Sequence, residues 1–231
     1  MTYGILTNKV CRSVFEEINN LPYCKACRRA RIEFAEKDKK HDGCYSNLLP
    51  GFSSEDVEIP IDVLIIGEAH GGGGEEWFRE QRRKVYDEVD QLAQYYLAKE
   101  LENFHQREMR CLFKALNKSG KKWVFTDLIK CFVSNDKVND KYQKNRREAI
   151  KHCRRYLKKQ IEVLQPKKIL SLGKTVAKKY FNLELGKWKD EHGTIHNCKF
   201  PVIVSIFPSK NTADWWVENK GWKKVLQNLF K

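Results

Sequence analysis

The sequence predicts an α/β protein, a three-layer α/β/α sandwich around a four-stranded, mainly parallel sheet. Two observations support this fold class. Four short runs are apolar at consecutive positions, as in strands that are covered on both faces, and helical patterns lie between them. The four expected strands are Asp62–Gly67, Trp123–Asp127, Lys168–Leu172 and Pro201–Ile206.

The helical patterns show apolar residues three or four positions apart, which places them on one face of a helix. The third pattern ends before Pro166, which cannot continue a helix. The patterns are Val85–Tyr96, a stripe through Leu112 and Leu116, Ile150–Leu164 and the shorter Thr175–Phe181. We expect one domain over residues 1–231, in which residues 1–60 form an irregular layer that carries a pair of cysteines.

The overall charge favours a polyanionic partner. Lys and Arg number 44 against 30 Asp and Glu, a formal net charge of +14, which suits nucleic acid; a charge that serves solubility alone is the alternative. No run reaches the roughly 18–20 apolar residues of a membrane-spanning helix. The start, MTYGILTNKVCRSVFEE, lacks the basic segment and long apolar core of a signal peptide. We therefore expect a cytoplasmic protein that acts as a monomer.

Much of the positive charge falls on one expected helix. Residues 141–160 contain nine Lys or Arg against the single acid Glu148. Such a surface binds phosphates strongly and without reading sequence. The alternative is an ordinary solvated helix face.

Eight cysteines raise the question of a metal site. Cys24 and Cys27 form a CxxC pair that can place two thiolates on one metal centre. No second tight pair is present, so two distant cysteines would have to complete either a zinc or an iron–sulfur site. Buried thiols beside a chance CxxC are the alternative.

The unusual residues of this chain collect where the expected strands end. In parallel sheets the functional site lies beyond the carboxyl ends of the strands. The segments at those ends are Gly67–Gly74, Thr126–Cys131, Leu172–Thr175 and Phe207–Asn211.

These segments resemble motifs of the uracil-DNA glycosylase superfamily, and most closely those of its iron–sulfur branch. Gly67–Gly71 is similar to the motif G-E-x-P-G, Thr126–Cys131 to T-N-x-x-K-C and Phe207–Ser209 to H-P-S. Cys153–Ile161 resembles the cysteine-led helix of the family. The resemblance covers roughly residues 21–210.

The resemblance implies a structural [4Fe–4S] cluster. Four cysteines fall where this branch holds it, and four thiolates are its usual ligands. They are Cys24, Cys27, Cys131 and Cys153.

The resemblance also implies a catalytic site. A glycosylase extrudes its base from the DNA stack into a pocket and then breaks the bond to deoxyribose. Glu68 occupies the position of the motif carboxylate that would orient water and stabilise the sugar cation; a carboxylate that only braces the loop is the alternative. Glu75 or Glu76 could share that role. Phe78, or its rival Trp77, would stack on the base, unless both belong to the core.

Three departures from the family concern the base. Asp127 replaces the Asn that reads uracil, and an ionised carboxylate only accepts hydrogen bonds, which suits the amine of cytosine; if the alignment is shifted, Asp127 caps a turn. Gly71 and Gly72 open a run of four glycines that leaves room for a bulky 5-substituent or a phosphate. Phe207 replaces the motif His, whose donor role His70, Lys210 or Asn211 could take. The Phe207 ring could itself stack on the base or wedge into the DNA.

We therefore predict a DNA glycosylase for a cytosine-type base, such as glucosylated hydroxymethylcytosine in phage DNA, that leaves an abasic site. The alternatives are a uracil-DNA glycosylase of base-excision repair, a catalytically weak DNA-binding homologue, and an unrelated zinc-bearing nucleic-acid module. The expected DNA contacts come from residues at the ends of the third and fourth strands. They are Lys174, Thr175, Ser209, Lys210 and Asn211.

Overall fold

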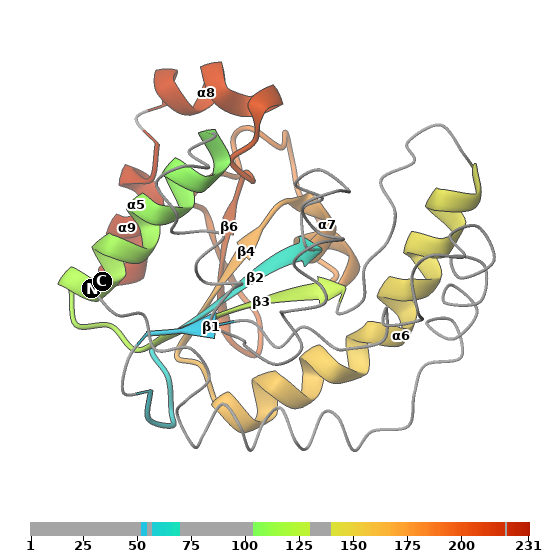
Figure 1. Cartoon of the computed structure of the whole chain (residues 1–231), viewed down its shortest axis with the longest axis horizontal. Coiled ribbons are helices and arrows are strands. Elements are labelled where there is room, and N and C mark those ends of the chain that lie inside the picture. Colours follow the sequence, from blue (N-terminus) through green and yellow to red (C-terminus); the bar gives the residue numbers. More distant parts are fainter. Residues whose placement is uncertain (1–51, 55–56, 70–103, 130–139, 220) are drawn as a thin grey trace, which may run out of the picture.

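The structure, a computed structural model, describes residues 52–54, 57–69, 104–129, 140–219 and 221–231. These residues form one mixed sheet with helices on both of its faces (Figure 1). The strands are β1 (Phe52–Ser53), β2 (Val63–Ala69), β3 (Trp123–Ile129), β4 (Lys168–Leu172), β5 (Ile195–Asn197) and β6 (Pro201–Ser205). The helices are α5 (Phe104–Lys118), α6 (Asp140–Leu164), α7 (Lys174–Lys179), the 3₁₀ turn η2 (Lys210–Thr212), α8 (Ala213–Glu218) and α9 (Lys223–Phe230).

The sheet confirms the expected α/β class, but it contains more strands than the four that we expected. Its order is β1-β3-β2-β4-β6-β5. The four apolar runs are β2, β3, β4 and β6, which pair in parallel. Within the described residues two further strands lie at the edges, each antiparallel to its neighbour, so a sheet of four strands was too small. With two and three residues, β1 and β5 are too short for a periodic pattern to show them.

The N-terminal layer falls mostly outside the described residues. Within it, Phe52–Ser53 pairs with β3 as an edge strand, so this part of the layer belongs to the sheet and is not irregular. The helix expected over Val85–Tyr96 also lies outside the described residues.

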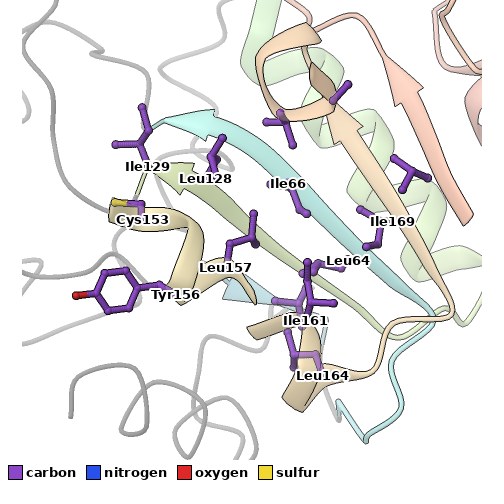
Figure 2. Close-up of a cluster of buried hydrophobic side chains, with 14 of the residues drawn as sticks. Leu64, Ile66, Leu128, Ile129, Cys153, Tyr156, Leu157, Ile161, Leu164 and Ile169 are labelled. Carbon is purple, nitrogen blue, oxygen red and sulfur yellow. The ribbon is translucent and has the colours of Figure 1, made fainter. Parts of the chain in front are cut away.

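One face of the sheet is covered by α6 and α7. The apolar stripe of α6 packs on β3 and shares one core with Leu64 and Ile66 of β2, and Figure 2 shows Ile161 of the helix beside Leu64. The helix ends at Leu164, as expected from the proline two residues later. The other face is covered by α5, α8 and α9, where Phe113 stacks on Trp123 with ring centroids 4.7 Å apart.

This topology collects the carboxyl ends of β2, β3, β4 and β6 at one edge of the molecule. The C-terminal ends of α5 and α6 lie at the opposite edge, where Lys121 N–H donates to Leu116 O and Ile61 N–H donates to Leu164 O. The N-terminal ends of both helices are therefore directed toward the carboxyl edge of the sheet. Among the described residues, no helix combines the length and the apolar character needed to cross a bilayer.

Candidate active site

The described parts of the four motif segments lie side by side, as expected from a parallel sheet. Gly67 of β2 is the register partner of Asp127 on β3, and Leu172 of β4 is the partner of Ser205 on β6. Since β2 also pairs with β4, the ends of all four strands form one continuous edge. Three strand spacings separate β3 from β6, which is about 14 Å. The candidate site extends along this edge.

Asp127 is buried at this edge, with only 2% of its surface exposed. It lies within β3, so the alternative in which it caps a turn is wrong. Its carboxyl group occupies the space over Gly67: a Cβ placed on that glycine would collide with Asp127 Oδ1, and it would lie 3.5 Å from Phe125 Cζ. The glycine of the first motif therefore makes room for the carboxylate of the second.

Glu68 follows Gly67 and is half-buried. Because side chains alternate along a strand, it projects from the opposite face of the sheet to Asp127. The two carboxylates therefore approach the edge from different faces. On the α6 face, the Thr126 hydroxyl donates to Oε1 of the buried Gln160 at 3.2 Å, which ties β3 to α6 beside the site.

The segment after β6 is held by side chains from several elements. His105, in the first turn of α5, stacks on Phe207 with centroids 4.6 Å apart and an interplanar angle of 30°. Its Nδ1 donates to Pro208 O at 3.0 Å. Burial lowers the pKa of His105 to about 4, although the bond to Pro208 opposes this. The imidazole is therefore neutral near neutral pH, with its proton on Nδ1.

A second histidine holds the residue before Phe207. Ile206 N–H donates to Nδ1 of His192 at 3.2 Å, and His192 Nε2–H donates to Gly221 O at 3.2 Å. Burial lowers the pKa of His192, so this ring is also neutral. It packs edge-on against Trp215 and Trp216 of α8.

The expected phosphate contacts lie beside this segment. Gly173 has φ of 87° and donates its N–H to Ser205 O at 2.8 Å, which fixes the turn from β4 into α7. Lys174 is exposed and Thr175 half-buried at the start of that six-residue helix. Their role toward phosphate stays a prediction.

The segment Phe207–Asn211 ends in η2. Thr212 accepts from Ser209 N–H at 2.9 Å and donates to Phe207 O at 3.0 Å. Asn211 is exposed and Lys210 begins the 3₁₀ turn. The structure thus brings Ser209, Lys210 and Asn211 to the same edge of the sheet as Asp127.

The described part of α6 exposes basic side chains, as expected, and some of them also contact other residues of the protein. Arg154 donates to Tyr180 O at 3.2 Å and lies over the Tyr180 ring, while Lys158 approaches Glu162 to 3.8 Å. The exposed basic residues along the described part of this helix are Arg147, Lys151, Arg154, Arg155 and Lys158.

Several expected site residues lie outside the described residues, and the structure does not place them. They are Cys24, Cys27, His70, Gly71, Gly72, Glu75, Glu76, Trp77, Phe78 and Cys131. Conversely, the sequence patterns do not indicate His105 or His192, because the contacts of these residues are with segments 103 and 14 residues away. Thr212, three residues after Ser209, is a local turn signal that could have been found.

No curated protein matches the chain. The model of the uracil DNA glycosylase superfamily matches residues 56–229, which include all four strand-end segments and most of the chain. The chain therefore belongs to the uracil DNA glycosylase superfamily, a membership that implies DNA binding and DNA glycosylase-type activity.

Proposed function

We propose that this protein is a DNA glycosylase that extrudes a cytosine-type base carrying a bulky 5-substituent, such as glucosylated hydroxymethylcytosine, from foreign DNA. Hydrolysis of the N-glycosidic bond then leaves an abasic site. The superfamily membership supports the reaction. The observation that carries the choice of base is the buried carboxyl group of Asp127 over Gly67.

The reasoning about the base is one of hydrogen-bond complementarity. The Asn that Asp127 replaces can donate to O4 of uracil, whereas an ionised carboxylate has no proton to donate. The exocyclic N4 amine of cytosine is a donor and satisfies the carboxylate. A buried polar group left with the wrong partner costs roughly 1–3 kcal/mol, and sites built in this way discriminate strongly between analogues. The run Gly71–Gly74 has no side chains, and by its resemblance to the family's loop it would leave room for a 5-substituent.

Glu68 is the proposed catalytic carboxylate. In the reaction, the bond between C1′ and the base nitrogen breaks while the oxygen of water bonds to C1′. The carboxylate orients this water and stabilises the positive charge that develops on the sugar. The proton released by the water goes to the departing base, so the products are the free base and an abasic site. Glu68 lies at the carboxyl end of β2, one residue after Gly67.

Base release from a panel of DNAs tests the proposal. Wild-type protein should release glucosylated hydroxymethylcytosine, detected by mass, in preference to uracil. Asp127→Asn keeps the shape of the side chain and restores a donor, so it should move the preference toward uracil by roughly tenfold or more. Release of uracil alone by the wild type, with no change in Asp127→Asn, would overturn the proposed substrate. Glu68→Gln should abolish release of every base.

A second candidate, a catalytically weak DNA-binding homologue, is favoured by Phe207. The motif His at this position would steady the departing base, and a donor of that kind contributes about 3–4 kcal/mol to catalysis. Phenylalanine has no such donor. This candidate predicts tight, salt-dependent DNA binding with no release of any base, whereas a repair enzyme would release uracil.

We also propose that Cys153 and three other cysteines bind a structural [4Fe–4S] cluster. Cys153 is fully buried in the core between α6 and the sheet, and Figure 2 shows it beside Ile129, the last residue of β3. Cys131 follows two residues later, and two residues of chain reach about 7 Å. The chain therefore keeps these two cysteines close, as shared ligation requires. A cluster and the exposed thiols of Cys111 and Cys198 suit a reducing compartment such as the cytoplasm.

Iron and sulfide content tests the cluster. Purified protein should be brown and contain iron and acid-labile sulfide. Cys153→Ser should lose iron and visible absorbance. Cys198→Ser is the matched control, because Cys198 is exposed and should leave both unchanged. A colourless wild type that contains zinc would favour the zinc alternative instead.

A further inference from the structure

The segment that follows β6 has its backbone held at consecutive residues by side chains. Ile206 N–H donates to His192, Phe207 O accepts from Thr212, Pro208 O accepts from His105 and Ser209 N–H donates to Thr212. The bonds measure between 2.9 and 3.2 Å. Side-chain bonds at successive residues restrict the conformation of an irregular segment, and functional groups are held in this way when they must not move.

His105 differs from His192 and Thr212 because it contacts both the backbone of this segment and the ring of Phe207. Its imidazole stacks on Phe207, and its Nδ1–H bonds to the next residue, Pro208. It comes from α5, which packs on the face of the sheet shared by Asp127 and Phe207. The ring of Phe207 packs against the same core and is half-buried. One histidine therefore determines both where the loop runs and how its aromatic ring is oriented.

We propose that His105 is a positioning residue that holds Phe207 as one wall of the base pocket. This inference rests on the proposed function in one respect, namely that Phe207 meets the extruded nucleotide. His105 acts through Phe207 and makes no contact with the reacting atoms. A wall that is fixed before DNA binds loses less conformational freedom on binding, so its contact with the nucleotide is more favourable.

The two contacts of His105 can be separated by substitution. His105→Asn places an amide near the position of Nδ1 and retains a donor for Pro208 O, but it loses the stack. His105→Phe retains the stack and loses the donor. An aromatic pair and a hydrogen bond each contribute a modest free energy. We expect a several-fold loss of kcat/KM for each variant and roughly tenfold for His105→Ala, with KM raised more than kcat is lowered.

A double-mutant cycle with Phe207→Ala tests whether His105 acts through the ring. If it does, His105→Phe and His105→Ala should have little further effect once Phe207 is alanine. His196→Ala is the matched control: His196 pairs with Glu191 at 3.0 Å on the edge strand β5 and should leave activity unchanged. Melting temperatures of all variants separate a loss of function from a loss of folded protein.

The result that overturns the inference is an equal loss from His105→Ala with and without Phe207, or no loss at all. The cycle uses whichever base the wild type releases, so a uracil-specific enzyme would refute the proposed substrate and leave this test intact. If no base is released, affinity for DNA that contains an abasic site replaces kcat/KM, with the same expected pattern and the same overturning result.

Discussion

Asp127 and Gly67 show how two residues on neighbouring strands depend on each other. The carboxyl group of Asp127 lies in the space that any side chain at residue 67 would fill. The glycine is thus required by the register between β2 and β3, in addition to any freedom it gives the following loop. A side chain at residue 67 should therefore displace the carboxyl group of Asp127, which we propose reads the base.

Gly67→Ala should destabilise the protein by about 1–3 kcal/mol, the usual cost of overpacking a dense site, and should also impair base release. Urea unfolding and the base-release assay measure the two effects. Gly186→Ala is the control, because a Cβ there meets only Oε1 of the Glu191 side chain, at 3.3 Å. Equal stability of the two variants would contradict the close approach of Asp127 to Gly67.

At the scale of the element, α6 combines a structural face with an electrostatic one. Its apolar stripe forms the core with the sheet, while its outer side exposes basic residues along the described part of the helix. Because the N-terminal half is directed toward the carboxyl edge of the sheet, Arg147 and Lys151 are, among the side chains that the structure describes, the exposed basic residues of α6 nearest to that edge. These two positions, four apart, lie on one side of the helix.

The double variant Arg147→Ala, Lys151→Ala should weaken DNA binding and reduce the slope of log affinity against log salt by up to about 2, since each phosphate contact contributes about 0.9. Binding titrations at several salt concentrations measure this slope. Lys114→Ala, Lys118→Ala is the matched control, because these two lysines are also four apart and exposed, but on α5. If the slope were unchanged in the α6 variant, the basic face of α6 would be an ordinary solvated face that does not contact DNA.

At the scale of the whole molecule, three titratable groups whose pKa values differ between the folded and unfolded states make the stability depend on pH. Burial lowers the pKa values of His105 and His192. For Asp62, burial raises the pKa, but hydrogen bonds from Lys167 and Lys122 outweigh it and the net pKa is lowered. All three groups therefore bind protons less readily in the folded protein than in the unfolded chain. By linkage, each makes the folded state less stable as the pH falls.

The free energy of unfolding should fall between about pH 7 and about pH 5, because unfolded His105 takes up a proton near pH 6.5 and the folded residue does so only near 4. Its share of this fall is about 2 kcal/mol. Urea unfolding of the wild type and His105→Asn at both pH values measures it, since the variant lacks the titrating ring. If the free energy of unfolding changed equally with pH in the wild type and in His105→Asn, the change would come from other titratable groups.

The local sequence predicts much of the fold because each of the runs β2, β3, β4 and β6 is mostly apolar and most of its residues are buried. The stripe of α6 is equally local, and Pro166 marks its end. Edge strands β1 and β5 escape prediction because short strands are stabilised by backbone pairing with a neighbour and carry no pattern of their own. The parallel order of strands also brings Asp127, Gly173 and Phe207 to one edge, as predicted.

By itself, therefore, the sequence determined the fold class, the four parallel strands and the edge at which the chemistry-bearing residues meet, since these follow from hydrophobic periodicity and strand direction. Only the tertiary structure decided that Gly67 makes room for Asp127 and that His105 stacks on Phe207. Those contacts join residues 60 and 102 positions apart. They arise from strand register and helix packing, which depend on the fit of the whole core and not on any local pattern.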